Sequence, residues 1–222
     1  MFKDHAVEAQ PIVNATLNAL LEWAPARGRA GADLRSRAGI IKAEAAHLLY
    51  NDTIGESMAR CFDLAVEVGM SIAQSENVRR VVDTFTTKTV GAGVVKDCMI
   101  QLTLVAQANI ILNTNFISRQ DIDAVQAMIN RSFNGVSESV TDRMDSMTNL
   151  AIVALHAALS FYLIETARPK PRIMNFQFNQ IMTTLTTSYR LYANAGRADE
   201  IRYENKVVHP AFALPFGRAL AA

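Results

Sequence analysis

The sequence predicts an all-α protein, a bundle of about seven helices with an extended C-terminal arm. Three observations support this fold class. Apolar residues recur every three or four positions in almost every segment, as they do on one face of an amphipathic helix. Hydrophobic residues make up 50% of the chain but aromatic residues only 7%, and alanine, the best helix former, is abundant. Glycine, proline and capping residues separate the periodic segments.

The first half of the chain contains a series of predicted helices. Pro11 suits the first turn of a helix that ends near Trp23, because proline is tolerated where no backbone donor is needed. Asp33 is the expected N-cap of the second helix, and Asp52 or Thr53 the expected cap of the third.

Two further helices are expected before residue 114. Ser75 starts the first, which Gly91 and Gly93 end. The next, over 94–113, is apolar on nearly all sides, which is typical of a central buried helix. Residues 99–105 also alternate with period two, so a strand remains an alternative there.

The second half is predicted to combine helices with extended segments. Ser118 and Asp121 form a capping box, with aspartate in place of glutamate, that opens a helix through Phe133. Asn134 and Gly135 kink or end that helix. Pro169 and Pro171 make 167–179 extended, because two prolines so close cannot lie within a helix. The remaining helices are expected at 144–162, at 180–196 with Gly196 as its terminating glycine, and at 197–206.

These elements suggest three regions. Residues 1–32 form an N-terminal helix and an Arg- and Gly-rich linker, 33–206 form the helical bundle, and 207–222 form the extended arm.

Composition excludes several classes of partner. The formal net charge is +1, which argues against a dominant electrostatic partner such as nucleic acid or an anionic membrane. The longest apolar stretch, at 149–164, contains His156 and is short and polar for a membrane span. Cys61 and Cys98 are interpreted as buried thiols in a reducing cytosol. No signal peptide pattern opens the chain, so we expect a soluble protein that does not act at a membrane.

The sequence contains no recognisable catalytic motif. Phosphate-binding glycine loops and metalloprotease or nucleophile-elbow patterns are missing, so we expect no enzyme, no cofactor and no metal site. The four histidines lie on separate segments: His5, His47, His156 and His209. His47 and His156 interrupt apolar helix faces and are interpreted as hydrogen-bonded core or boundary residues.

Two basic clusters are candidates for contacts with phosphates or acidic surfaces. The first contains Arg27, Arg29, Arg35 and Arg37, and the second Arg168, Lys170 and Arg172. Flexible basic loops can bind a phosphate backbone. Neither cluster has interleaved aromatic residues, so solubilising loops or protein contacts are the favoured interpretation, and DNA is a possible but disfavoured partner.

The C-terminal quarter carries a more specific pattern. An Arg- and Pro-rich lead-in precedes a helix that ends in Tyr-Arg-Leu-Tyr. An acidic turn, an asparagine, His-Pro, an aromatic residue and a last proline follow. The residues of this pattern are Tyr189, Arg190, Leu191, Tyr192, Arg197, Ala198, Asp199, Glu200, Ile201, Asn205, His209, Pro210, Phe212 and Pro215.

This pattern resembles the C-terminal end of the DNA circularisation proteins of Mu-like contractile-tailed bacteriophages. The resemblance extends over about the last hundred residues and includes the segment that begins at Ser118. It implies a virion component at the distal tail or baseplate hub, made in the host cytoplasm. Its expected partners are the tail tube, the hub and neighbouring copies of the same chain. The family's N-terminal domain has no visible counterpart here.

The arm contains the candidate interface, which consists of His209, Pro210, Phe212, Leu214 and Phe216. Pro210 biases His209 toward an extended conformation, and the three large apolar residues alternate as they do in a strand that adds to a sheet edge. Two interpretations remain open: the arm docks on a neighbour, or it folds back over its own helices. Structural assembly is the favoured function. A DNA-end-holding (circularisation) factor and a cytosolic tail-assembly chaperone are the alternatives.

Overall fold

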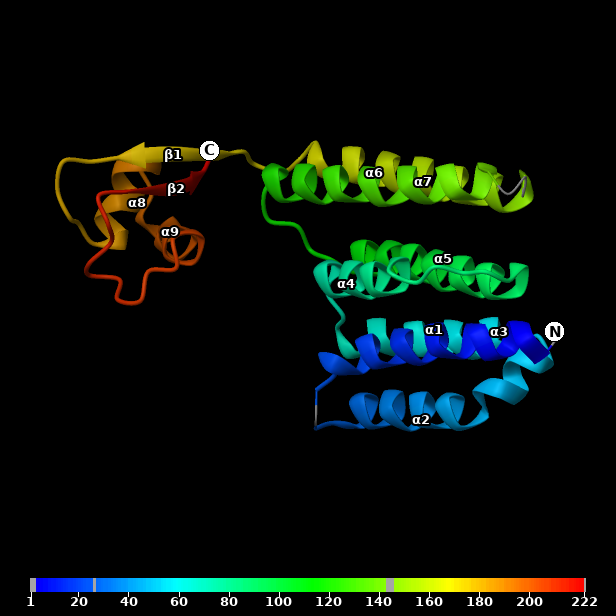
Figure 1. The fold of residues 1–222 in the computed structure, drawn as a ribbon. Coiled ribbons are helices and arrows are strands. Elements are labelled where there is room, and N and C mark those ends of the chain that lie inside the picture. The colour runs from blue at the N-terminus through cyan, green and yellow to red at the C-terminus, as the bar shows by residue number, and fades with distance from the viewer. Residues whose placement is uncertain (1–2, 26, 143–145, 222) are drawn as a thin grey trace. The chain divides into compact units, whose positions relative to one another are not determined.

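A computed structural model describes residues 3–25, 27–142 and 146–221, and it confirms a predominantly α-helical fold (Figure 1). The side chains of 137–146 are not described. The helices are α1 (Lys3–Glu22), α2 (Arg29–Tyr50), α3 (Ile54–Val68), α4 (Ile72–Asp83), α5 (Val90–Leu112), α6 (Arg119–Asp142), α7 (Ser146–Ala167), α8 (Thr184–Tyr192), the 3-10 turn η1 (Ala195–Arg197) and α9 (Ala198–Glu204). Two strands, β1 (Ile173–Gln177) and β2 (Phe216–Leu220), form a small sheet.

The chain divides into two compact units. Unit 1 contains 1–114 and 132–153, and unit 2 contains 115–131 and 154–222. The expected boundaries at 32/33 and 206/207 do not coincide with these units. The N-terminal helix α1 belongs to the bundle because it packs against α2, α4 and α5. The arm belongs to unit 2 because β2 pairs with β1.

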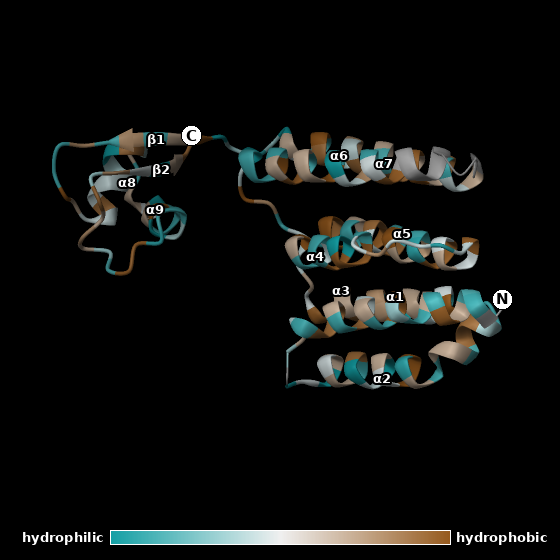
Figure 2. Ribbon diagram, viewed as in Figure 1, coloured by the Kyte–Doolittle hydropathy of each residue, from teal (hydrophilic) through white to brown (hydrophobic). Residues whose placement is uncertain are grey.

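Unit 1 is a layered helical bundle with α5 at its centre. Within it, α1 and α3 lie between α2 and the pair α4 and α5 (Figure 1). The α5 helix packs against α1, α3 and α4, and its fully buried residues include Met99 and Ile111. Figure 2 shows the dense apolar colouring of α5. Residues 99–105 are therefore helical, and the strand alternative is wrong: the segment is apolar on several sides because helices surround it.

Several predicted helix starts are displaced. The α1 helix begins at Lys3, so Pro11 lies inside it and not in its first turn. Pro11 removes the donor for the carbonyl group of Val7, but both residues are exposed, so water can satisfy that carbonyl. The α2 helix begins at Arg29 after Gly28, and Asp33 is not its cap but lies one turn inside, 3.9 Å from Arg29.

The start of α4 shows why the Ser75 prediction is wrong. Ser71 is the N-cap, and it forms a capping box with Gln74 in which each side chain bonds to the other residue's backbone N–H group. Ser75 lies inside the helix, where its buried hydroxyl group donates to the carbonyl oxygen of Thr103 on α5 at 3.3 Å.

Three predicted glycine breaks are also misplaced. Thr89 caps α5, so Gly91 and Gly93 lie in its first turn, where they do not end a helix. The α8 helix ends at Tyr192, and Ala193 in a left-handed conformation (φ 53°) takes the terminating role expected of Gly196.

The capping box at the start of α6 is confirmed. The Ser118 hydroxyl group accepts from the N–H group of Asp121, and the Asp121 carboxylate accepts from the N–H group of Ser118, both at 3.2 Å. The helix does not end at Asn134 and Gly135 but continues to Asp142. Met144 lies outside the described residues.

Unit 2 contains a small sheet packed on short helices. The strands are antiparallel, with Ile173 opposite Leu220 and Gln177 opposite Phe216. Phe176, Ala219 and Ile201 of α9 form the core of this part, and Phe178, Leu191 and Tyr192 pack around them. The predicted extended segment therefore includes a strand, and the predicted final helix is α9, with Asp199 and Glu200 in its first turn.

Candidate assembly interface

The C-terminal segment 207–220 is part of unit 2 and folds back on the earlier residues of that unit. The N–H group of Ala213 donates to Met182 at 2.9 Å, and the carbonyl oxygen of Pro210 accepts from Thr184 at 2.8 Å. Residues 216–220 then pair with β1 along its full length. Two interpretations of the arm were open. The backbone of the arm follows the second one and folds back, because its partners in these bonds all belong to unit 2.

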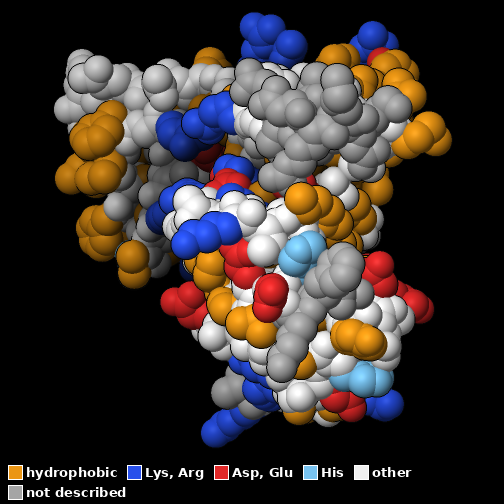
Figure 3. Space-filling view, turned by 45° about the vertical axis from the view of Figure 1, so that its right-hand side comes forward, with side chains coloured by type: hydrophobic (Ala, Val, Ile, Leu, Met, Phe, Trp, Pro, Cys, Tyr) orange, Lys and Arg blue, Asp and Glu red, His pale blue; other side chains and the backbone are white. Residues whose placement is uncertain are grey.

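The side chains of the same segment divide into two sets. Ala213, Ala219 and Leu220 are buried. The predicted interface residues point outward: Phe212 is 71% exposed, Leu214 58% and Phe216 60%. The alternation seen in the sequence is therefore present from Phe212 to Phe216, where Ala213 is buried and the three large apolar residues are on the surface. Figure 3 shows that orange hydrophobic side chains of this and other segments lie among charged ones on one face of the molecular surface.

His209 and Pro210 form a turn at the start of this surface. The carbonyl oxygen of His209 accepts from the N–H group of Phe212 at 3.0 Å, and its Nδ1 atom accepts from Ala211 at 3.3 Å. The rings of His209 and Phe212 lie 5.4 Å apart. Both His209 and Pro210 are exposed, and they line an open cavity of about 560 Å³ beside Thr183.

Both edges of the sheet are capped by a side-chain amide, which the sequence did not indicate. Asn205 accepts from the N–H group of Arg218 at 2.7 Å and donates to its carbonyl oxygen at 2.8 Å. On the other edge, Gln120 accepts from the N–H group of Ile173 at 2.8 Å and donates to its carbonyl oxygen at 3.2 Å. A carboxamide offers one donor and one acceptor, so it can replace a peptide unit of a further strand.

Most of the pattern residues in the C-terminal quarter of the chain pack within unit 2 and are not fully exposed on its surface. The guanidinium group of Arg197 lies 3.7 Å from the ring centroid of Tyr192 and forms two bonds of 2.8–2.9 Å with Glu200. Ile201 is 1% exposed. The pattern used for the family resemblance therefore contains a folding core, and its exposed members are Tyr189, Arg190, Asp199, His209, Pro210 and Phe212.

The two basic clusters lie in different units. Arg27, Arg29 and Arg37 are exposed near the start of α2, whereas Arg35 bonds to the carbonyl oxygen of Pro25. In the second cluster, Arg168 pairs with Glu165 at 3.0 Å, and both Arg168 and Arg172 are exposed. Arg29 and Arg168 each face a carboxylate, which lowers the local positive charge available to a phosphate.

The histidines and cysteines show no catalytic arrangement among the described residues. His47 is exposed, not in the core, and bonds to Asn51, while His156 bonds to Asn130 at 2.8 Å. Burial raises the pKa of the Cys61 thiol to about 11 and also raises that of Cys98, so both favour the unreactive thiol form. No group of three or more His, Cys, Asp or Glu residues in the described ranges is arranged to hold a metal ion.

A partly buried polar cluster in unit 1 was not expected from the sequence. Glu76 on α4 forms a bond of 2.7 Å with Arg79, and its carboxylate also accepts from Gln107 on α5 and Ser132 on α6. Arg79 reaches Asp83 as well. The cluster therefore joins three helices of unit 1.

Comparison with known proteins adds no family assignment. No protein-family model matches the chain, and no curated protein sequence matches it.

Within the described ranges, two helical stretches, Val90–Leu112 and Met147–Ala167, are long and apolar enough to cross a membrane by length and composition alone. The first is a core helix, since 56% of its most apolar window is buried, whereas only 17% of the second is.

Proposed function

We propose that this chain is a structural component of a contractile bacteriophage tail, located at the distal tail or baseplate hub and acting by protein–protein assembly. It is made in the host cytoplasm and its partners are the tube, the hub and neighbouring copies. The family resemblance of the C-terminal quarter suggests the setting. The observation that supports the assembly role is that the C-terminal segment exposes large apolar side chains while its backbone is held by hydrogen bonds.

The energetics of this surface suit an interface. Transfer of one phenylalanine side chain from water contributes about 1.5–3 kcal/mol, and Phe212 and Phe216 are 71% and 60% exposed. Their backbone is already ordered by bonds to Met182 and β1, so docking costs little further conformational entropy. When many subunits repeat such a contact, the effective affinity rises steeply.

Removal of the whole segment is a poor test of this role. Deletion after Val208 removes β2 together with buried Ala213, Ala219 and Leu220. We therefore expect this truncation to unfold the C-terminal part of unit 2.

A sharper test changes only the exposed side chains. We expect Phe212→Ser combined with Phe216→Ser to keep the circular dichroism spectrum and thermal midpoint of the parent chain, because neither side chain is buried. Incorporation into particles, measured by mass spectrometry of purified phage that encodes the variant, should fall. Tyr203→Ser is the matched control, since Tyr203 is 77% exposed on α9 of the same unit.

Two results would contradict the proposal. Normal incorporation of the double variant would show that this surface is not an interface. Finding the unchanged chain in the lysate but not in purified particles would favour the cytosolic assembly chaperone instead.

A further inference from the structure

We propose that β1 pairs edge to edge with β1 of a second copy of the chain, in antiparallel orientation, so that the two small sheets join into one. Every residue that carries this inference belongs to unit 2. The pairing is between copies of this chain in solution, so it does not rest on the proposed tail role.

The backbone groups of β1 point alternately toward β2 and away from it. Phe178, directly after the strand, donates to the carbonyl oxygen of Pro215, so the even-numbered residues bond to β2 and the odd-numbered residues face outward. The N–H and C=O groups of Ile173 accordingly point away from β2, and Gln120 bonds to both.

The other outward-facing residues of β1 are Asn175 and Gln177. No group in the described part of the chain bonds to their N–H or C=O groups, and both residues are exposed. The outer edge of β1 is therefore closed at Ile173 and open over the rest of the strand.

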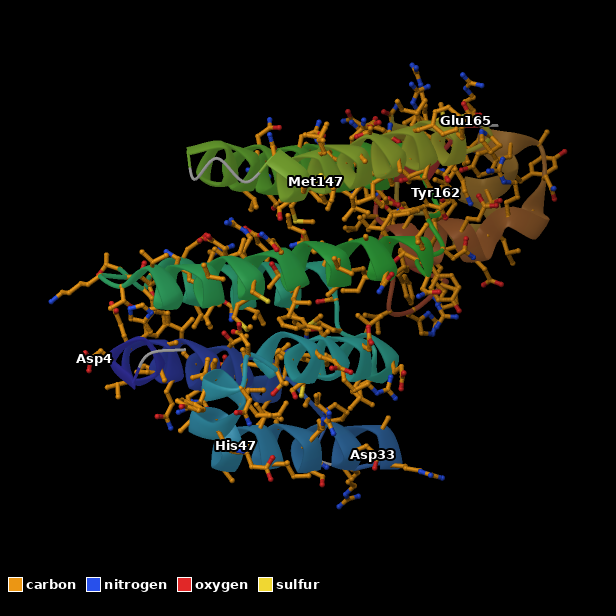
Figure 4. All side chains as sticks on the ribbon, turned by 90° about the vertical axis from the view of Figure 1, so that its right-hand side faces the viewer. Asp4, Asp33, His47, Met147, Tyr162 and Glu165 are labelled. Atoms are coloured by element: carbon orange, nitrogen blue, oxygen red, sulfur yellow. The ribbon has the colours of Figure 1, made fainter. Side chains whose placement is uncertain are left out.

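Free backbone groups at a strand edge specify what can cover them. Another extended strand presents N–H and C=O groups at the matching spacing, so it can add to the sheet. The exposed apolar side chains of α7, such as Met147 in Figure 4, give no such direction, because the backbone groups of a helix bond to one another. The open part of β1 is thus a site for a third strand.

The sequence around β1 favours a second copy as the source of that strand. Residues 173–181 contain no charged residue, no proline and no glycine, although edge strands are normally protected by charges or proline. Uncharged segments of this kind pair with copies of themselves, and Asn, Gln and aromatic side chains add to the pairing. A second copy supplies the same unprotected segment.

Gln120 restricts the register of the pair. Because it occupies Ile173, a partner strand has only Asn175 and Gln177 to bind. An antiparallel pair centred on Phe176 places Asn175 of each copy opposite Gln177 of the other, and it uses every free backbone group of both strands. A pair centred on Asn175 would meet Gln120, and one centred on Gln177 would need Asn179, which lies beyond β1.

Charge is compatible with this antiparallel pair. Arg172, directly before β1, would lie opposite position 180 of the second copy. At about 3.4 Å per residue, the two Arg172 residues are then roughly 27 Å apart, which exceeds the screening length of about 8 Å. Arg218, on β2, pairs with Glu204 at 3.1 Å within its own chain.

The joined sheet does not continue into a fibre. Its two ends are the outer edges of β2, and on each of them Asn205 already bonds to the backbone of Arg218. Phe216 lies opposite Gln177 on the exposed face, so pairing places Phe216 of both copies on one face of a four-stranded sheet.

The first test measures self-association of the full chain by sedimentation equilibrium over a wide concentration range. We expect a reversible dimer. Gln177→Pro removes an N–H group that β2 does not use, so the fold should persist, while half of the pairing bonds are lost and the dissociation constant should rise by more than about tenfold. Gln177→Ala is the matched control, because it keeps the N–H group and should leave the dimer largely intact.

Two results of this first test would overturn the proposal. One is a parent chain that stays monomeric at every concentration, which would leave the edge to a strand of another protein. The other is an equal effect of Gln177→Pro and Gln177→Ala in variants that keep the parent's circular dichroism spectrum.

The second test needs no variant, so it decides the matter even if Gln177→Pro fails to fold. Hydrogen exchange of single backbone amides, followed by NMR, should show protection at Asn175 and Gln177 that rises with protein concentration. The amide of Phe178 should stay protected throughout, because it bonds to Pro215. Exchange at Asn175 and Gln177 that is independent of concentration would contradict the pairing.

The third test determines the register by disulfide formation in a Cys98→Ser background, with Cys61 buried. A pair centred on Phe176 predicts a mixed disulfide between Asn175→Cys and Gln177→Cys chains, and less crosslinking of either variant with itself. Preferred crosslinking of either variant with itself would refute this register.

Discussion

The hydroxyl group of Ser132 on α6 donates a hydrogen bond to the carboxylate of Glu76 on α4, at 3.1 Å. Ser132 is 2% exposed, and Glu76 lies in the polar cluster with Arg79 and Gln107. This bond therefore ties the later part of unit 1, which begins at Ser132, to helices from the first half of the chain.

Replacing Ser132 should destabilise unit 1. A hydrogen bond to a charged group contributes about 1.5–3 kcal/mol, and we expect Ser132→Ala to cost about 1–2 kcal/mol because Glu76 keeps its other partners. Urea denaturation measures this cost. Ser36→Ala, at an exposed position of α2, is the control and should change stability by less than about 0.5 kcal/mol. Equal costs at both positions would argue against the bond.

The same carboxylate predicts a dependence of stability on pH. Burial alone would raise the pKa of Glu76, but hydrogen bonds and charge from Arg79, together with hydrogen bonds from Ser132 and Gln107, outweigh it and hold the pKa below its ordinary value of 4.5. Because the folded pKa is lowered, this stabilisation is present above the unfolded value and is lost as pH falls through the folded one.

The comparison with Glu76→Gln isolates this contribution. The stability difference between the parent chain and the variant should be constant near neutral pH and shrink as pH drops below about 4.5. Thermal unfolding of both proteins across this range measures it. A difference that stays flat down to the lowest pH would contradict the assigned pKa direction.

Replacing Gly217 by alanine should destabilise the sheet, whereas replacing Gly39 by alanine should stabilise α2. A Cβ atom at Gly217 would clash with Asn205 Oδ1 and would lie 3.0 Å from the ring of Phe176. Gly217→Ala should therefore break the Asn205 cap and loosen the sheet. Gly39 lies inside α2 with nothing within 4 Å of the added atom, so Gly39→Ala should stabilise by up to about 1 kcal/mol.

Hydrogen exchange tests the Gly217→Ala prediction, and the thermal unfolding midpoint tests the Gly39→Ala prediction. Faster exchange across 216–220 in Gly217→Ala, with a raised midpoint in Gly39→Ala, is the expected result. Unchanged exchange in Gly217→Ala would mean that the strand tolerates the side chain and that the contact with Asn205 is not needed.

The two acidic residues at the start of α9 should differ in importance. Both lie in the first turn, where a carboxylate gains about 0.3–1 kcal/mol from the helix dipole. Glu200 also bonds to Arg197, whereas Asp199 is exposed. Hydrogen exchange over 201–206 should accelerate more in Glu200→Lys than in Asp199→Lys. The opposite order would mean that the Arg197 contact contributes little.

Binding to DNA should be weak. The net charge is +1, and Arg29 and Arg168 each face a carboxylate. A gel-shift titration at physiological salt should show no tight complex. The DNA-end-holding alternative would gain support if tight binding were found and were lost when Arg27, Arg29, Arg35 and Arg37 are replaced by alanine.

Local signals predicted the parts of the fold that depend on neighbours in sequence. Ser118 and Asp121 are three residues apart, so their capping box was visible, and the alternation of Phe212, Leu214 and Phe216 predicted which side chains share a face. The direction in which the C-terminal segment folds was not predictable, because it depends on pairing with β1 about forty residues earlier. The same holds for Gln120, whose partner Ile173 lies far along the chain.

Other errors came from patterns with more than one solution. Ser71 and Ser75 are both serines close to the start of an apolar-periodic segment, and the bonds with Gln74 identify Ser71 as the cap. Gly91 and Gly93 suit a helix start as well as a break. The Glu76 cluster gave no signal at all, since its members come from three helices and each residue type is common on helix surfaces.

The amide caps on the sheet have a consequence for how the protein behaves in a crowded cell. A two-stranded sheet normally offers two open edges to any unfolded or nascent chain. Here the side-chain amides of Asn205 and Gln120 each occupy one backbone pairing position, one on each edge of the sheet, so no further strand is needed there. Conversion of Asn205 to aspartate would remove the donor to the Arg218 carbonyl oxygen and reopen that edge. Deamidation at this position is thus a route by which an aged sample would become prone to aggregation.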